Sequence, residues 1–198
     1  VRRLEAAGVD LIECSFSCPH GMPERGMGST IGQDPELTER TARWVKEAAE
    51  RVPIVIKLTP QIADITAAAH AVKRSGADGV CAINTLKSLI GVDLDTFIPY
   101  PNVGGYSTYG GYSGPAIKPV TLRCVAEIAK SVDIPIAAVG GISTWMDAVE
   151  FLLLGATNIQ LCTAVMRNGF RIIEDLIDGL TVYLEEKGMK SVTELVGK

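Results

Sequence analysis

The amino-acid sequence predicts an α/β protein with a parallel sheet, and more narrowly the C-terminal five strand–helix units of a (β/α)8 or TIM barrel. Short β-branched runs alternate with helical stretches through all 198 residues, whereas a closed barrel of eight units needs roughly 250. Most predicted strands end in polar or glycine-rich residues, which would converge on the mouth of a barrel. No G-x-G-x-x-G follows a strand, which weakens the competing prediction, an open doubly wound sheet.

The strands are predicted from short runs of β-branched and apolar residues, bounded by turn residues. Residues 1–7 look like the end of an amphipathic helix that Gly8 terminates, so we expect the domain to begin before this chain. Prolines at 53 and 135 each open one of the predicted strands. These strands cover residues 10–16, 54–58, 79–83, 134–139 and 158–162.

The helices between these strands are predicted from their capping residues. Asp34 can cap a helix that has Pro35 at its first position. Thr144 is followed three residues later by Asp147, the spacing of a capping box. The other predicted helices cover residues 62–75, 120–131 and about 170–187. We treat residues 1–198 as a single, partial domain.

Composition excludes several classes of protein. The chain is 47% hydrophobic and 21% charged, and 19 Lys and Arg against 23 Asp and Glu give a net charge of −4. Binding to nucleic acid or to an anionic membrane is therefore not expected. No apolar run is long enough to cross a bilayer and no signal peptide opens the chain, so we expect a cytoplasmic protein. Five cysteines without a C-x-x-C argue against a disulfide scaffold, and we predict no metal site.

Residues 13–18 carry the first candidate site. Side chains alternate along a strand, so Cys14 and Phe16 should face the helices while Glu13, Ser15 and Ser17 point into the barrel mouth. A serine bonded to backbone is the competing interpretation. Cys18 begins a loop rich in Gly, Pro and Met, residues 18–33, which we expect to act as a lid. A thiol releases a proton near neutral pH more readily than a serine hydroxyl does, which makes Cys18 a candidate acid.

Polar residues also end the next two strands. Lys57 interrupts an apolar strand, where an ammonium is costly to bury unless a counter-charge meets it. Asn84 and Thr85 bring amide and hydroxyl groups suited to the edge of a planar heterocycle. Snorkelling of the lysine to water and ordinary turn formation by the asparagine remain open alternatives.

Glycine-rich turns follow the later strands. Gly114 precedes one helix, Gly140 and Gly141 precede another, and Cys162 and Thr163 end the last strand. Paired glycine turns near the final strands of a barrel commonly make a phosphate cradle from backbone N–H groups and a helix N-terminus. We therefore predict phosphate binding here, with simple flexible turns as the alternative.

Several motifs together resemble the flavin domain of the dihydropyrimidine dehydrogenase family, especially its bacterial catalytic subunits. The motifs are SFSCPHGMPERGMGSTIGQDPEL, KLTP, AINT, GYSGPAIKP, VGGIS and LCTAVM, and the resemblance runs nearly end to end. SGPAIKP and GGI are shared with the dihydroorotate dehydrogenases and identify only the superfamily. The CPHGM…ERGMG segment favours the dihydropyrimidine branch.

This resemblance implies roles for individual residues. Cys18 would be the general acid that protonates the pyrimidine 5-carbon while reduced FMN gives hydride to the 6-carbon. Ser15, which stands where the family usually has Asn, and Ser17 would line the substrate pocket. Asn84 and Thr85 would hold the amide edges of the pyrimidine, and Lys57 would lie near the flavin's pyrimidine end. The FMN phosphate would be bound by Gly114, Gly140, Gly141, Cys162 and Thr163.

The resemblance also implies a larger assembly. Three further barrel strands would precede this chain, and FAD and iron–sulfur clusters would lie on other segments or on an electron-transfer partner subunit. The oligomeric state is left open, with a homo-oligomer as one alternative. The expected activity is interconversion of uracil or thymine and their 5,6-dihydro forms. The alternatives are a dihydroorotate dehydrogenase, a non-redox phosphate-binding barrel such as an isomerase or aldolase, or a fragment without activity.

Overall fold

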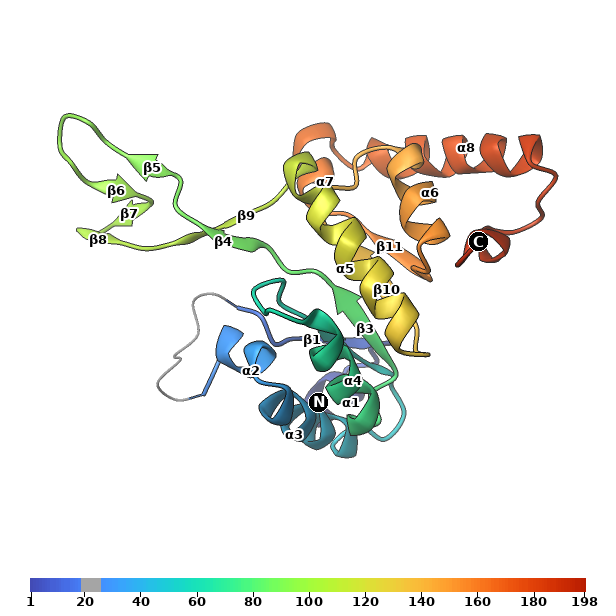
Figure 1. Ribbon diagram of the computed structural model, residues 1–198, viewed down its shortest axis with the longest axis horizontal. Coiled ribbons are helices and arrows are strands. Elements are labelled where there is room, and N and C mark those ends of the chain that lie inside the picture. Colours follow the sequence, from blue (N-terminus) through green and yellow to red (C-terminus); the bar gives the residue numbers. More distant parts are fainter. Residues whose placement is uncertain (19–25) are drawn as a thin grey trace.

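The five predicted strands form one parallel sheet in the computed structural model, which describes residues 1–18 and 26–198 (Figure 1). The strand order is β1-β2-β3-β10-β11, and every neighbouring pair is parallel. The strands are β1 (Ile12–Ser15), β2 (Ile54–Lys57), β3 (Gly79–Ala82), β10 (Ile136–Val139) and β11 (Asn158–Gln160). This order follows the chain without the reversal that a doubly wound sheet requires, so the prediction of five barrel units is confirmed.

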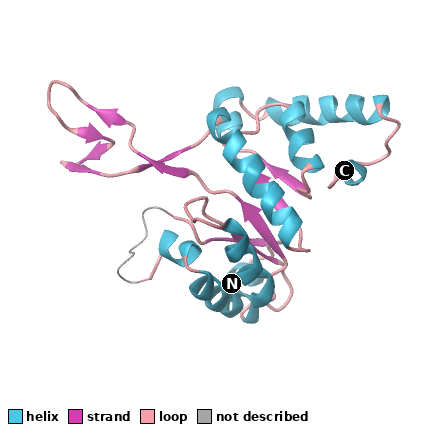
Figure 2. Cartoon of the chain, in the orientation of Figure 1, coloured by secondary structure: helices cyan, strands magenta, loops and turns pink. Residues whose placement is uncertain are grey.

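Helices cover one face of the sheet, and five of them contact one another in chain order, as in the outer ring of a barrel (Figure 2). Contacts join α3 to α4, α4 to α5, α5 to α6 and α6 to α8. The helices are α1 (Arg2–Ala6), α2 (Ser29–Gln33), α3 (Pro35–Glu47), α4 (Ile65–Ser75), α5 (Lys118–Ser131), α6 (Trp145–Leu153), α7 (Thr163–Asn168) and α8 (Arg171–Glu186), with 3-10 turns at Pro115–Ile117 and Val192–Leu195.

A hydrogen bond between the two edge strands shows that the sheet is strongly curved. Gln160 Nε2 on β11 donates to Glu13 Oε2 on β1 at 2.8 Å. In a flat sheet these strands, four steps apart, would be separated by about 19 Å, too far for two side chains to bridge. The inner face is therefore concave, as in an arc of a barrel.

The two faces of the sheet differ in polarity as the alternation predicted. Phe16 is buried in the hydrophobic core beneath the helices, and the half-buried Cys14 packs against that core. Strand pairing places Glu13 beside Val55 and Ser15 beside Lys57 on the inner face. The inner face thus carries charged and polar side chains, whereas the outer face holds the apolar core.

The predicted helix caps are confirmed. Asp34 Oδ1 accepts the N–H groups of Glu36 and Leu37 at 2.9 and 3.0 Å. Thr144 and Asp147 form a complete capping box at the start of α6. The helix predicted over residues 62–75 begins later, at Ile65, because Asp64 accepts the N–H of Thr66 and caps it there. All five predicted strands are also shorter than expected, since their outer residues lie beyond the paired ladder.

Residues 86–112 form an antiparallel arm that the sequence analysis did not predict. It projects from the body between β3 and α5 (Figure 1). Its ladders pair β4 (Leu86–Ser88) with β9 (Gly110–Tyr112), β5 (Gly91–Val92) with β6 (Pro99–Tyr100), and β7 (Asn102–Val103) with β8 (Tyr106–Ser107). Many large apolar side chains on the arm are exposed, including Ile90, Leu94, Phe97, Val103 and Tyr106.

The predicted lid loop lies partly outside the described residues, which exclude 19–25. Its described end is not structureless, because Ser29–Gln33 forms the short helix α2. A side chain at Gly32 would overlap the carbonyl oxygen of Phe16, so glycine lets α2 pack directly on the end of β1. The N–H of Ser29 donates to the carbonyl of Cys18 at 2.9 Å, which holds the start of α2 against the main chain at Cys18. No helix within the described residues is long and apolar enough to cross a membrane.

Candidate functional site

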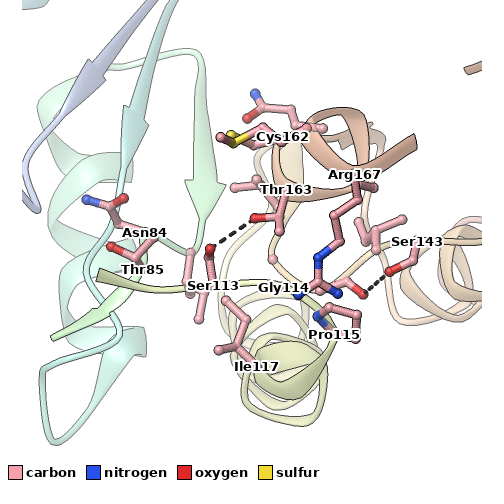
Figure 3. A pocket seen from close by; sticks show the side chains of 18 of the residues that line it. Asn84, Thr85, Ser113, Gly114, Pro115, Ile117, Ser143, Cys162, Thr163 and Arg167 are labelled. Atoms are coloured by element: carbon pink, nitrogen blue, oxygen red, sulfur yellow. Dashed lines mark hydrogen bonds between the residues drawn. The ribbon is translucent and has the colours of Figure 1, made fainter. Parts of the chain in front are cut away.

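A cavity of about 380 Å³ lies at the carboxyl ends of the strands, within the usual range of small-molecule sites (Figure 3). It brings together eight of the predicted site residues, which come from the ends of four strands and from the segment before α5. They are Lys57, Asn84, Thr85, Gly114, Gly140, Gly141, Cys162 and Thr163. The expectation that polar strand ends converge on one mouth is thus met for these residues.

Three glycines shape one wall of this cavity. Gly114, Gly140 and Gly141 have φ values of 88°, 135° and 86°, a region that side chains other than glycine rarely adopt. A Cβ at Gly141 would lie 2.6 Å from the backbone nitrogen of Lys118. Within the described chain, none of the three glycine N–H groups donates a hydrogen bond to another residue. They form a concave backbone surface with donors left for an anion.

The Gly140–Gly141 turn is held by Asp147. Asp147 Oδ2 accepts the N–H groups of Ser143 and Thr144 at 2.8 and 2.9 Å, and Lys118 Nζ donates to its other oxygen at 2.6 Å. Burial raises the pKa of Asp147, but the hydrogen bonds from Lys118, Ser143 and Thr144 have the larger, opposite effect. The net result is a pKa below the ordinary value. Asp147 therefore stays ionised near neutral pH and keeps the turn in place.

Lys57 enters the same cavity from β2 and meets the counter-charge that its position in a strand calls for. Its Nζ lies 3.2 Å from Glu13 Oε1 on the neighbouring strand. Burial raises the pKa of Glu13, but hydrogen bonds from Gln160 and Cys81 together with the Lys57 ammonium outweigh that effect and lower it. The Glu13 carboxyl is therefore ionised near neutral pH.

Three predicted residues lie beside the cavity without lining it. The carbonyl of Ser17 accepts a hydrogen bond from Asn84 Nδ2 at 3.0 Å, so the end of β1 adjoins the cavity at Asn84. Ser15 Oγ and Ser17 Oγ are 3.2 Å apart, and Ser17 is buried. Cys18, the next residue, is exposed. A functional role for these three side chains stays a prediction.

The sequence analysis missed several residues that line the cavity. Ser113 Oγ and Thr163 Oγ1 are 2.9 Å apart, and Ser143 and Gln160 also line the wall. Figure 3 shows the guanidinium of Arg167 close to Gly114. The spacing could have indicated Arg167, because it follows Thr163 by four residues and α7 places both on one face.

The described residues contain no cluster of three or more His, Cys, Asp or Glu side chains that could hold a metal ion. Asn84 and Thr85 offer hydrogen-bond donors and acceptors at one end of the cavity, and Lys57 adds an ammonium from β2. The glycine wall and Arg167 offer anion contacts at the other. The arrangement suits an elongated ligand that has a polar ring and an anionic group.

The fold and this cavity define part of a (β/α)8 barrel with a small-molecule site at the carboxyl ends of its strands, and comparison with known proteins shows that the chain belongs to the dihydroorotate dehydrogenase family, whose model matches residues 1–184. The chain is 47% identical, over 99% of its length, to the NAD-dependent dihydropyrimidine dehydrogenase subunit PreA of Escherichia coli. It is 45% identical, over 98% of its length, to the catalytic subunit of dihydroorotate dehydrogenase B (NAD(+)) of Pyrococcus furiosus. It covers 48% and 62% of those proteins.

A solved structure confirms the fold. The DHODH of Eimeria tenella, crystallised with ferulenol, superimposes with a TM-score of 0.75 over 96% of this chain and 54% of that one, at 20% identity. The predicted family resemblance is therefore confirmed. The chain spans about half the length of the relatives it matches, so the activity of the whole protein is a matter for proposal.

Proposed function

We propose that the protein to which this chain belongs is an FMN-dependent oxidoreductase that interconverts uracil or thymine and their 5,6-dihydro forms. The observation that carries this proposal is the single cavity that joins Lys57, Asn84 and Thr85 to the glycine wall. The 47% identity to a dihydropyrimidine dehydrogenase subunit supports the choice of substrate class.

The residues present fit FMN. The wall formed by Gly114, Gly140 and Gly141 leaves backbone N–H groups free, as a phosphate cradle requires. A Cβ at Gly140 or Gly141 would overlap Thr121 or Lys118, so these turns need glycine. Thr163 and the backbone of Cys162 would complete the cradle. Lys57 would place a cation near the flavin's pyrimidine end, where negative charge accumulates on reduction.

The chain's own residues would bind the pyrimidine and move a proton. Asn84 and Thr85 would hydrogen-bond its amide edges, with Ser15 and Ser17 beside them. Bound FMN would supply hydride chemistry at the pyrimidine 6-carbon. The Cys18 thiol would give its proton to the 5-carbon. The hydrogen bond from Asn84 to the carbonyl of Ser17, the residue before Cys18, supports this role.

The proposal includes a partner and a compartment. Electrons would reach FMN from an electron-transfer subunit that carries FAD and iron–sulfur clusters. Two of the matching relatives are named as a subunit and as a catalytic subunit, which supports a multi-subunit assembly. We place the protein in the cytoplasm. Residues 18–33 would act as the lid over the substrate.

Purification of the full-length protein tests this proposal. We expect a yellow protein that releases FMN on denaturation and oxidises dihydrouracil with an artificial electron acceptor. A colourless protein that neither binds added FMN nor oxidises dihydrouracil would contradict it and would favour a non-redox barrel or an inactive fragment.

Dihydroorotate is the second candidate substrate, because the chain is 45% identical to a dihydroorotate dehydrogenase catalytic subunit. Orotate carries a carboxylate that uracil lacks and would need an added cationic or amide contact. The same assay with dihydroorotate separates the two. Faster turnover of dihydroorotate than of dihydrouracil and dihydrothymine would assign the protein to that branch.

A further inference from the structure

Below the cavity, the inner face of the sheet carries four polar side chains in mutual contact, which we call the Glu13 cluster. Its members are Glu13 on β1, Lys57 on β2, Cys81 on β3 and Gln160 on β11. Glu13 Oε1 accepts from Lys57 Nζ at 3.2 Å, and Glu13 Oε2 accepts from Gln160 Nε2 at 2.8 Å. Cys81 Sγ lies 3.5 Å from Gln160 Oε1. Glu13 is thus the centre of the cluster.

The members of the Glu13 cluster differ in their access to the cavity. Lys57 and Gln160 line it, whereas Glu13 and Cys81 do not. Glu13 therefore lies behind Lys57 and holds the ammonium from the inner side. An ammonium has three donors, and Glu13 is the partner of Lys57 among the described residues. The remaining donors are available to a ligand in the cavity.

The cluster also fixes which groups are charged. Burial, reinforced by the negative charge of Glu13, raises the pKa of Cys81, so its thiol stays protonated and acts as a donor. The pKa of Glu13 is lowered, as described above, so its carboxylate persists at neutral pH. The cluster presents one cation to the cavity with one anion directly behind it.

We propose that Glu13 is a positioning residue that holds the Lys57 ammonium toward the cofactor and offsets part of its charge, thereby setting the reduction potential of bound FMN. This inference rests on the proposed function. A cation near the ring stabilises reduced, anionic flavin, and a carboxylate behind that cation weakens the effect. Removing the carboxylate and removing the cation should therefore shift the potential in opposite directions.

The first test measures the midpoint potential of FMN bound to the full-length protein. Glu13→Gln keeps the side-chain size and an acceptor oxygen but removes the charge. We expect this variant to favour reduced over oxidised FMN about tenfold more than the wild type does. For a two-electron couple, this change raises the midpoint potential by about 30 mV. Lys57→Met should lower the potential. A purely structural role for Glu13 would not produce these opposite shifts.

The second test needs no cofactor. The titration of the Glu13 carboxyl is followed by NMR in protein labelled with 13C-glutamate, and the Glu13→Gln spectrum assigns the resonance. We expect Lys57→Met to raise the pKa of Glu13, because the neighbouring positive charge is lost. Lys73→Met, at an exposed position on α4, serves as the matched control and should leave the titration unchanged.

The outcomes distinguish this inference from the proposed function. A wild-type protein that binds no FMN would overturn both. If FMN binds but Glu13→Gln leaves the potential unchanged or lowers it, only the role of Glu13 is wrong. Should Glu13→Gln fail to fold, the Glu13 resonance is assigned by through-bond NMR experiments instead, and the titration of Lys57→Met still decides, because an unshifted Glu13 resonance would show that the two side chains are not coupled.

Discussion

At the scale of single residues, two hydrogen bonds hold the main chain at Ser17 and Cys18, next to Asn84 of the cavity wall. The carbonyl of Cys18 accepts from Ser29, and the carbonyl of Ser17 before it accepts from Asn84. The main chain at Ser17 and Cys18 is therefore held at two points, by Asn84 on the cavity wall and by Ser29 at the start of α2. An acid that protonates a bound substrate needs such a defined position as well as suitable chemistry.

Replacing Cys18 tests this role. We expect Cys18→Ala in the full-length protein to lower turnover of dihydropyrimidine by about two to four orders of magnitude, the usual contribution of a general acid or base. FMN affinity should be unchanged. Steady-state kinetics and flavin titration measure the two effects. Cys14→Ala is the control, since Cys14 faces the helices; wild-type turnover in the Cys18 variant would remove the thiol from the mechanism.

Arg167 offers a second test at this scale. Its guanidinium forms no ion pair or side-chain hydrogen bond with another described residue and points toward the glycine wall. Charge-assisted hydrogen bonds contribute about 1.5–3 kcal/mol, so we expect Arg167→Gln to weaken FMN binding at least roughly tenfold. Riboflavin, which lacks the phosphate, should bind equally to both proteins.

Fluorescence titration with the two flavins measures this difference. Arg123→Gln is a matched control, because Arg123 is paired with Glu127 on α5 and does not line the cavity. An equal loss of affinity for FMN and riboflavin would contradict phosphate recognition by Arg167.

At the scale of elements, the packing of α6 on α8 depends on a glycine. A side chain at Gly179 would overlap the indole ring of Trp145, which itself packs against the tilted ring of Tyr183 with ring centroids 5.7 Å apart. Glycine is a poor helix former, yet here it lets the two helices approach closely. The close approach has to compensate for the weaker helix.

We therefore expect Gly179→Ala to destabilise the protein although alanine favours a helix. The gain in helix propensity is about 1 kcal/mol, whereas overpacking against a fixed ring costs about 1–3 kcal/mol. Urea unfolding measures the balance. Asp178→Ala, at the exposed neighbouring position, is the control, because it increases helix propensity without a clash. Equal stabilisation by both substitutions would show that the Trp145 ring moves aside at little cost.

The elements that the sequence predicted well are those governed by local rules. Asp34 and the Thr144–Asp147 pair cap helices through contacts within a few residues, and the strands follow from apolar runs. The arm was missed although one signal for it was present. Gly104 and Gly105 make the two-residue turn between β7 and β8, with φ values of 59° and 87°, and a Gly-Gly pair is typical of such hairpins.

The site was only partly predictable for a physical reason. Glycine pairs and polar strand ends can be identified in the chain, so the cavity residues were found. The contact between Glu13 and Gln160 depends on the curvature of the sheet, which no local pattern encodes. Side chains that meet across the concave face become neighbours only when all five strands are assembled.

At the scale of the whole molecule, Glu5 fastens α1 to the entrance of β2. Its Oε1 accepts the N–H groups of Glu50, Arg51 and Val52 at 3.0, 2.9 and 3.1 Å. The hydrogen bonds from Arg51 and Val52 lower the pKa of Glu5 below its usual 4.5. One buried carboxylate thus links two segments that lie more than forty residues apart.

This shift predicts how stability depends on pH. Because the pKa of Glu5 is lower in the folded state, its contribution is fully present above about pH 4.5 and is lost as the pH falls through the folded pKa. Glu5→Gln has no such charge to lose. We expect the wild type to be more stable near neutral pH and the difference to shrink in acid.

Urea midpoints measured for both proteins at several pH values check this. The midpoint for wild type should fall faster than that for Glu5→Gln as the solution is acidified. Parallel pH profiles would show that the ionised form of Glu5 adds nothing to stability.

The strand order has a consequence for biosynthesis. Each strand of the sheet pairs with the one that precedes it along the chain, so a nascent chain leaving the ribosome can add strands one at a time to a finished edge. No earlier pairing has to be undone for a later strand. The bond between Glu13 and Gln160 joins the first and last strands of this sheet, so it forms only after β11 has been added.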